Sequence, residues 1–566
     1  MFCKRALLLL AGLFVISCAV ACRRGARQPV ERVGIAPLEN LSEDAGLGWA
    51  GWAIAEVAAA EITGSPRIHP VRLADGRDSA AVGVTAELTG YYAVAGGRLS
   101  LHVARVDLAT RRVTGSLEVA EAFPDGVLRA GDALARWIEP DARPFDTRSV
   151  AALQAFAEGR EAAGTEEALK AYERSVTADP DFGAPYAAWA QALVLGADRP
   201  GAERVLERAR ARGDRIAESR RAELDLLGAA LSGDPKGRRR ALIALTRATP
   251  ADAAVFRQLA GEEAAARRYG EAAEFYRKAA SLDPLSGPTW NQLGYVEASR
   301  RNLEGARSAL AEYARLEPRN ANPSDSLGDV HYHLGAFEEA EKHYLRAYEI
   351  DPSFLGGVDL YKAARARLMT GDVSGAETLF GRYLGSTVAA RDGLSDFRRA
   401  QWLYLTGRRE EAVARLKRFA LTTRAPQWQS AAASQLSVWG AMAGVAEDRA
   451  RCETIAGERG RVVGMLLAGR FPEAIPLLEN LVVRGNPLSP DRAEVLLAWA
   501  LVETGQVKKA VPFVEAFGVP PPGLEDLFAA LSFPRILQLR AVVFDQVGRP
   551  REAAEVREVL RRLPVR

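Results

Sequence analysis

The sequence is poor in the residues on which many enzymes and metalloproteins depend. Its 566 residues include only 4 cysteines, 5 histidines and 4 methionines. Four cysteines give no sign of a disulfide framework, although a bridge between Cys22 and Cys452 stays open. Lysine and arginine total 75 against 72 for aspartate and glutamate, which leaves a net charge of only +3. Such a balance lacks the electrostatic footprint of nucleic-acid binding, so we expect no nucleic-acid partner.

Familiar catalytic motifs are missing as well. The chain has no P-loop, no H-E-x-x-H, no G-x-S-x-G and no carboxylate pair that the sequence places in one pocket. Asp181–Gly183 spells a kinase metal motif, but the other kinase motifs are absent. Gly46–Gly51 spells a dinucleotide fingerprint, yet the stretch Glu39–Ala45 separates it from the preceding strand and antiparallel strands follow. His331, His333 and His343 do not share a helix face. We therefore expect no enzymatic activity, catalytic residue, cofactor or metal.

A repeat with a fixed period organises the middle of the chain. Prolines, alanines, leucines and glycines recur at one constant step, at Pro250, Pro284, Pro318 and Pro352, at Ala272, Ala306 and Ala340, at Leu259, Leu293 and Leu327, and at Gly294 and Gly328. Two helical patterns within a fixed period of 34 are typical of tetratricopeptide repeats. The units 287–320 and 321–354 resemble that family's W-L-G-Y-A-F-A-P pattern, with Trp290, Tyr344 and Ala347 among the matches.

This resemblance implies an all-α solenoid in which each repeat is a pair of helices. One pair cannot cover its own apolar face, so neighbouring pairs stack and bury it. Gly294 and Gly328 are expected where the two helices of one repeat approach closely. We predict a tetratricopeptide array over 146–384, which also resembles the repeat tails of bacterial serine/threonine kinases. Divergent repeats are predicted over 385–566, because Gly335, Gly371 and Gly407 follow a looser step of 36.

The first residues resemble a bacterial lipoprotein signal. Lys4 and Arg5 precede the apolar run Ala6–Ile16. This run is too short to span a bilayer, which needs about 20 residues. Residues 1–17 would be the signal peptide, Cys18 the lipidated residue and 18–30 a polar tether. Cys22 is the alternative site of lipidation, and an ordinary cleaved signal peptide is the alternative to an anchor. Several acyl chains would hold the protein at a membrane permanently.

An α+β domain is predicted over 31–140. Strands are expected at 32–38, 67–73, 84–94, 99–107 and 113–119, with the last three antiparallel, and helices at 46–62 and 125–138. The opening stretch, Val33 to Ser42, resembles the start of the TolB amino-terminal domain. That resemblance carries no catalytic residue to this chain. The predicted fold class is thus a small α+β domain followed by an all-α tetratricopeptide solenoid.

Binding remains as the predicted function. In tetratricopeptide arrays the first helix of each repeat lines a concave groove that takes an extended peptide or a partner helix. The repeat register places a set of polar and aromatic residues on this face, namely Arg257, Asn291, Tyr295, Asp325, Asp329, Tyr332 and His333. Tyrosines with mixed polar groups are plausible interface chemistry. The alternative is that these residues are merely solvated.

These patterns predict a lipid-anchored envelope protein that scaffolds other proteins through its groove. Ala19 follows Cys18 where an aspartate would signal inner-membrane retention, so we expect the outer membrane, facing the periplasm. Two other functions stay open. The 31–140 domain could bind a small molecule, nucleotide or glycan in a pocket around Asn40–Gly51, or the chain could be a regulatory subunit of a kinase or transcriptional signalling system.

Overall fold

The computed structural model describes residues 30–73, 83–386 and 394–426, and several shorter stretches after them: 428–429, 432, 435–436, 461–462, 464–466, 468–484, 493–515, 518, 521–522 and 535–562. The predicted signal peptide, Cys18, Cys22 and nearly all of the tether lie outside these residues. None of the helices in the described part has the length and apolar character needed to cross a membrane. The chain forms two compact units. The first ends at Phe256 and also contains Ser281–Pro284, and the second contains Arg257–Ala280 and the chain from Leu285 onward.

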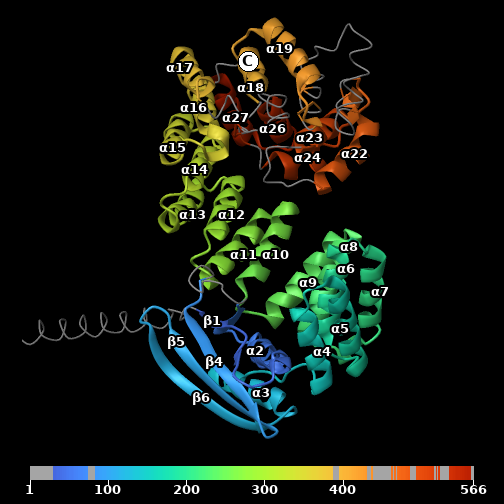
Figure 1. Ribbon diagram of the computed structural model, residues 1–566. Coiled ribbons are helices and arrows are strands. Elements are labelled where there is room, and N and C mark those ends of the chain that lie inside the picture. The colour runs from blue at the N-terminus through green and yellow to red at the C-terminus, as the bar shows by residue number, and fades with distance from the viewer. Residues whose placement is uncertain are drawn as a thin grey trace, which may run out of the picture. The chain divides into compact units, whose positions relative to one another are not determined.

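A six-stranded mixed sheet forms the amino-terminal part of the first unit (Figure 1). Five strands follow the order β3-β1-β4-β5-β6, and the short β2 pairs with β4. Strand β1 runs parallel to both β3 and β4, whereas β4, β5 and β6 form an antiparallel meander. The strands are β1 (Glu31–Ile35), β2 (Glu39–Asn40), β3 (Ile68–Arg72), β4 (Ala86–Ala95), β5 (Arg98–Asp107) and β6 (Arg112–Ala122). The predicted strands are confirmed, and β2 was not foreseen.

Two helices cover one face of this sheet. They are α2 (Trp49–Ile62), which follows a short 3-10 turn at Ala45–Leu47, and α3 (Gly126–Ile138). The sequence β1-α2-β3 is a crossover between parallel strands, so both strands end at the same edge of the sheet. Gly51 permits the tight packing of α2, because a Cβ there would lie 2.2 Å from the carbonyl oxygen of Leu38. This glycine therefore has a packing role.

Six helices complete the first unit. They form consecutive pairs, α4 (Val150–Glu161) with α5 (Thr165–Ala178), α6 (Gly183–Leu195) with α7 (Arg199–Arg210), and α8 (Glu218–Ser232) with α9 (Pro235–Ala248). Phe182, in the kinase-like motif, is fully buried and packs edge-on against Phe145 and Phe156. The segment 214–250, which lacks the repeat signature, nevertheless forms the pair α8 and α9.

The second unit continues the helical pairs. Its helices are α10 (Ala253–Ala265), which begins in the first unit, α11 (Tyr269–Leu282), α12 (Gly287–Ser299), α13 (Leu303–Leu316), α14 (Asn322–His333), α15 (Phe337–Ile350), α16 (Val358–Met369), α17 (Val373–Leu384), α18 (Ser395–Leu405), α19 (Arg409–Thr422), α22 (Phe471–Arg484), α23 (Ala493–Glu503), α24 (Val507–Val514), α26 (Arg535–Gln546) and α27 (Pro550–Arg562). A mixed sheet with helices followed by paired helices confirms the predicted fold class.

The small residues of the repeat have the packing role that the repeat pattern predicted. A Cβ on Gly294 would lie 2.7 Å from Leu310 Cγ, and one on Gly328 would lie 2.5 Å from the ring of Tyr344. Both glycines therefore sit where the two helices of one repeat approach most closely. Glycines with positive φ also occupy turns between helices, at Gly335, Gly371 and Gly407 of the looser step and, later in the chain, at Gly469, Gly505 and Gly548. A left-handed turn favours glycine at each of these positions.

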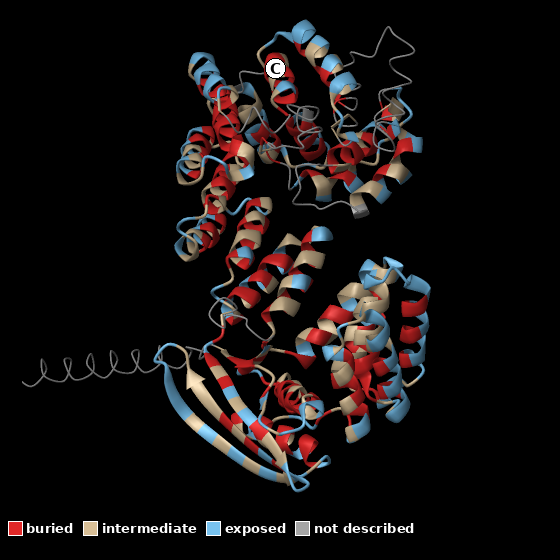
Figure 2. Cartoon of the chain, in the orientation of Figure 1, coloured by how far each residue is buried: buried red, intermediate tan, exposed pale blue. Residues whose placement is uncertain are grey.

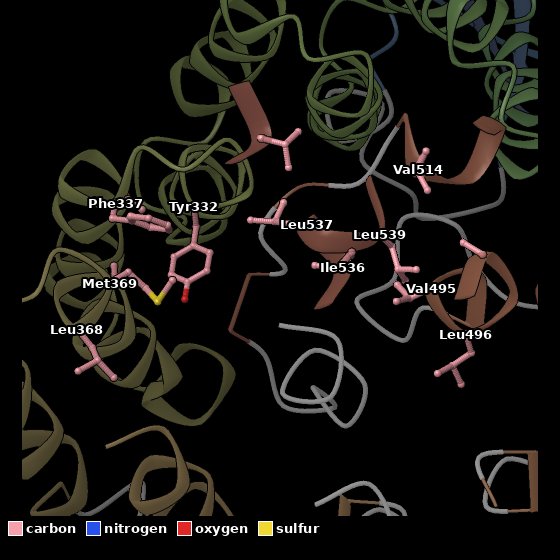
Figure 3. Close-up of a cluster of buried hydrophobic side chains, with 14 of the residues drawn as sticks. Tyr332, Phe337, Leu368, Met369, Val495, Leu496, Val514, Ile536, Leu537 and Leu539 are labelled. Atoms are coloured by element: carbon pink, nitrogen blue, oxygen red, sulfur yellow. The ribbon is translucent and has the colours of Figure 1, made fainter. Parts of the chain in front are cut away.

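The carboxy-terminal helices pack against earlier repeats of the same unit. Tyr332 and Phe337 belong to one hydrophobic cluster with residues of α24 and α26, including Val514 and Leu537 (Figure 3). In addition, Arg267, in the turn after α10, forms a salt bridge of 2.8 Å with Glu494 of α23. Both of these side chains are nearly buried, at 13% and 11% exposure. The second unit is therefore held together by contacts between residues far apart in the sequence.

Candidate functional site on the first helices of the repeats

The first helices α10, α12, α14 and α16 carry a column of polar residues at one position of the repeat. Arg257, Asn291, Asp325 and Asp359 follow one another at the repeat period of 34. Because the four residues occupy the same turn of successive first helices, they lie along one side of the array. We call this side the first-helix face. Its central part, α16, is buried along almost its entire length (Figure 2).

Lys362 lies at the centre of this face and holds α14 to α16. Its Nζ atom donates hydrogen bonds to Asp325 Oδ1 at 2.5 Å and to Asp329 Oδ1 at 3.0 Å. The lysine side chain is only 6% exposed. Nζ also lies 5.3 Å from the centre of the Tyr344 ring, a cation–π arrangement. The buried ammonium of Lys362 therefore interacts with two carboxylates and one aromatic ring.

Two tyrosines complete the surroundings of Asp329. The hydroxyl of Tyr344, on α15, donates to Asp329 Oδ1 at 2.9 Å, and the hydroxyl of Tyr295, on α12, donates to Oδ2 at 3.2 Å. Tyr295 also lies 3.2 Å from Ser326 Oγ. Burial and the nearby Asp329 raise the pKa of both tyrosines well above the usual value. Both hydroxyls thus keep their protons and act as donors to the carboxylate.

Three carboxyl groups surround one ammonium in this cluster, and a proton on the third carboxyl group, Asp359, reduces the imbalance. Asp359 is completely buried, and neither of its oxygens has a hydrogen-bond partner within the described residues. Burial, reinforced by Asp325, raises the pKa of Asp359 to about 9. Asp359 is therefore neutral at pH 7. Burial also raises the pKa of Asp329, to about 6, with Asp325 adding to the effect.

Lys362 itself stays charged. Burial alone would lower its pKa, but Asp325, Asp329 and Asp359 outweigh burial and hold the pKa well above the ordinary value. The cluster thus pairs the ammonium of Lys362 with Asp325 and Asp329 and contains one acid, Asp359, that is neutral at pH 7. Buried charges survive only when they are paired and hydrogen-bonded, and this arrangement meets that condition for Lys362.

The polar row continues from α16 to α18 with the opposite charge. Arg365 Nη1 donates to the hydroxyl of Tyr361 at 2.9 Å, and that hydroxyl lies 3.1 Å from Gln401 Oε1. Arg398, only 1% exposed, donates to the hydroxyl of Tyr383 and lies 5.8 Å from the centre of the Tyr361 ring. The first-helix face therefore changes from acidic, around Asp325, to basic, around Arg398.

The predicted groove residues fall into three groups. Arg257, Asn291 and Tyr295 lie partly exposed on the first-helix face. Asp325 and Asp329 belong to the Lys362 cluster, so they are structural as well as polar. Tyr332 and His333 were predicted to face the groove, but their exposed fractions are only 1% and 7%, and that of Asp325 is only 4%. Tyr332 packs edge-on against Phe337 within the cluster that includes the carboxy-terminal helices, which the repeat register could not reveal.

The histidines do not converge on a common point. His331, 3% exposed, stacks on His343 of α15 with ring centres 5.2 Å apart. Burial, aided by the neighbouring His343, lowers the pKa of His331 to about 4, so the ring is neutral at pH 7. Within the described residues, no three side chains of histidine, cysteine, aspartate or glutamate are arranged to hold a metal ion.

Sequence reasoning missed Asp359, Lys362, Arg365 and Arg398. The signal for Asp359 was present, because it follows Asp325 by one repeat period of 34. Lys362 and Arg398, like Arg365 and Gln401, are separated by the looser step of 36 that the later repeats follow. Extending the register by both steps would have placed all of these side chains on the first helices.

Comparison with known proteins supports the repeat assignment. Residues 325–354 match the family model of the tetratricopeptide repeat. This segment contains Asp325, Asp329 and Tyr344. None of the curated proteins matches the chain. Tetratricopeptide domains typically bind proteins or peptides.

Two solved structures of MamA are similar to this chain. The crystal structure of MamA protein is 21% identical in sequence and has a TM-score of 0.27. The alignment covers 30% of this chain and 90% of the MamA chain. A second crystal structure of MamA is 15% identical in sequence and has a TM-score of 0.23. The alignment covers 34% of this chain and 91% of that MamA chain. The family match covers one tetratricopeptide repeat, residues 325–354, and paired helices precede and follow this segment.

Proposed function

We propose that this protein is a lipid-anchored scaffold of the bacterial cell envelope, which binds a protein partner along its first-helix face and catalyses no reaction. The observation that carries the proposal is the partly exposed start of the polar and aromatic row, with Arg257 on α10 and Asn291 and Tyr295 on α12, whereas the row from α14 to α18 is mostly buried. Tyrosine and arginine, which are frequent in this row, are enriched in protein interfaces. The expected partner is a protein or peptide and includes no nucleic acid.

The partly exposed residues at the start of the row are the expected contact points. Asn291 Oδ1 is buried and has no hydrogen-bond partner within the described residues. Arg257 Nη1 lies 3.4 Å from the hydroxyl of Thr289 on the next first helix, a long contact that leaves its other donors available. Because an unsatisfied buried acceptor costs free energy, a donor from a partner at Asn291 would be favourable.

The face also supplies a reason for selectivity. Lys362 offsets only one of the two charges of Asp325 and Asp329, so the acidic end would repel a partner carboxylate. An extended segment with hydrogen-bond donors near α12 and α14 matches the acidic end of this face. Electrostatic complementarity of this kind mainly improves specificity and the rate of association.

Crosslinking tests the binding surface. A photoreactive amino acid at position 291, on the first helix α12, is compared with one at position 307, an exposed site on the second helix α13. We expect one partner to be captured from position 291 and not from position 307. Capture from position 307 alone would contradict the proposal.

The anchor rests on the residues around Cys18 and needs its own test. Cells are labelled with a palmitate analogue, and the full chain is compared with Cys18→Ser and Cys22→Ser variants. We expect Cys18→Ser to lose the label and leave the membrane fraction, with Cys22→Ser as the matched control. Sucrose-gradient separation of the two membranes then tests the outer-membrane location, and recovery of unlabelled wild-type protein in the soluble fraction would refute the anchor.

A further inference from the structure

A second candidate site lies in the first unit, at the edge where two parallel strands end. Ile35 closes β1, and Arg72 and Leu73 close β3; these residues line a cavity of about 490 Å³ together with side chains of α2, α4 and α8. In open sheets, ligands bind in the crevice outside the carboxyl ends of parallel strands. The volume falls within the range of cavities that hold small molecules. We call this cavity the strand-end pocket.

The floor of the strand-end pocket is a network of paired charges, of which Glu56 is buried and Arg72 is exposed. Arg72 donates to both oxygens of Glu56, at 2.6 and 3.0 Å. Arg220 lies 3.7 Å from Glu56 and pairs on its other side with Asp146 and Glu223. Glu56 is 8% exposed and Arg220 has a side-chain exposure of 16%. These contacts fix the two guanidinium groups before any ligand arrives.

The pKa of Glu56 indicates the sign of the electrostatic potential at the floor of the pocket. Its burial alone would raise the pKa of the carboxyl, but Arg72, Arg220 and Arg160 outweigh that effect and lower it. The lining of the pocket carries three arginines against two glutamates, Glu56 and Glu161. Positive charge therefore exceeds negative charge among the lining side chains alone, and Arg220 is paired with Asp146 and Glu223 outside the lining.

The rim of the strand-end pocket carries a further arginine, and one of its walls is aromatic and apolar. Arg160, on α4, is exposed and forms no salt bridge with any described residue. It interacts with the side chain of Tyr172, and its remaining donors can meet a ligand. Trp52 of α2 and Phe156 of α4 meet edge to face, with ring centres 5.3 Å apart and an interplanar angle of 83°. Aromatic rings bury large apolar area and hold flat groups in defined orientations. Pro37 and Ala55 extend this apolar wall.

We propose that the strand-end pocket binds a small ligand that carries a carboxylate or phosphate group on an apolar or aromatic body. Arg160 and the outward edge of Arg72 receive the anion, and Trp52 and Phe156 contact the body. Arginine suits both anions because its planar fork forms paired charge-assisted hydrogen bonds. This site is separate from the first-helix face and from the stretch Asn40–Gly51, where the sequence suggested a pocket.

Binding of four small probes to the full chain tests this proposal. Phenyl phosphate and benzoate carry the two anions on the same ring, and benzyl alcohol and benzylamine are the neutral and cationic controls. Dissociation constants are measured by ligand-observed NMR and by thermal shift. We expect the anionic probes to bind at least about tenfold more tightly than the controls, a difference typical of charge-assisted hydrogen bonds. The tighter of the two anions identifies phosphate or carboxylate as the natural group.

Three arginine variants localise the binding. Arg160→Gln and Arg72→Gln should each weaken the anionic probes by about tenfold or more. Arg174→Gln, at an exposed site on α5 outside the pocket, should leave them unchanged. Circular dichroism confirms folding, and Arg160→Gln is the decisive variant because its side chain forms no salt bridge in the described structure. Equal binding of benzylamine, or unchanged anion binding in both pocket variants, would overturn the proposal.

Discussion

Replacing Asp359 by asparagine should stabilise the first-helix face at neutral pH and remove part of its pH dependence. Asp359 has a pKa of about 9 in the folded protein, against an ordinary value of 3.8. Between these values the folded state holds a proton that the unfolded state releases. Stability is therefore fully present below about pH 4 and falls as the pH rises toward 9.

The size of the effect follows from the same shift. Each pH unit in this window costs about 1.4 kcal/mol per proton, so keeping Asp359 neutral at pH 7 costs nominally about 4 kcal/mol. Asparagine has the shape of the neutral acid and needs no proton, and its amide can donate to Asp325. Because the titrations of neighbouring carboxyls are coupled, about 4 kcal/mol is a ceiling, and we expect a gain of about 1–3 kcal/mol.

The assay must report on α14 and α16 alone, because repeat proteins open locally. Hydrogen exchange of the amides in these helices, corrected for the intrinsic rate at pH 6, 7 and 8, gives the free energy of opening. Asp359→Asn should show a higher value at pH 7 and a shallower decline toward pH 8. Glu377→Gln, at an exposed site on α17, is the matched acid-to-amide control and should match the wild type. Lower stability of Asp359→Asn at every pH would refute the reasoning.

Two further substitutions test the packing. Lys362→Met should destabilise α14 and α16 by about 3–5 kcal/mol in the same exchange assay, because it leaves buried carboxylates without their cation. Lys342→Met, at an exposed salt bridge, should change stability by less than about 1 kcal/mol, and equal effects would contradict the role of Lys362. Gly328→Ala should cost about 1–3 kcal/mol in thermal unfolding, because its Cβ meets the ring of Tyr344. Gly381→Ala has open space and should gain up to about 1 kcal/mol, and a stabilising Gly328→Ala would disprove the close approach.

The repeat period carried most of what the sequence could predict. It reports on contacts within one helical pair and between adjacent pairs, so it placed α10–α15 and the close approaches at Gly294 and Gly328. Alternating apolar residues likewise placed β4, β5 and β6 next to one another, because hairpin strands pair with their neighbours in sequence. These contacts are local, and local patterns determine them.

Contacts between distant segments were beyond the same reasoning. Tyr332 shares its hydrophobic cluster with helices as late in the chain as α27, which begins at Pro550, and no period links the two. The pairing of β1 between β3 and β4 depends on which strand ends meet, which alternation does not specify. Lys362 was missed for a different reason. It lies one helical turn after Asp359, and only the packing of α16 against α14 shows that its side chain reaches Asp325.

The strand-end pocket illustrates a similar limit. Its floor joins Arg72, at the end of a strand, to Arg220, which lies much later in the sequence on α8. The resemblance of the 31–140 segment to the TolB amino-terminal domain gave no reason to include the helices that follow. The structure shows that α4 and α8 complete the cavity, because these helices pack in the same unit as the sheet.

The central claim is that the first helices of the repeats bind the partner. Hydrogen exchange of the full chain, measured with and without the protein captured by crosslinking, tests it most directly. We expect binding to slow exchange in α12, α14 and α16, and to leave the exposed faces of α13, α15 and α17 unchanged. Protection confined to α13, α15 and α17, with no change in the first helices, would contradict the account.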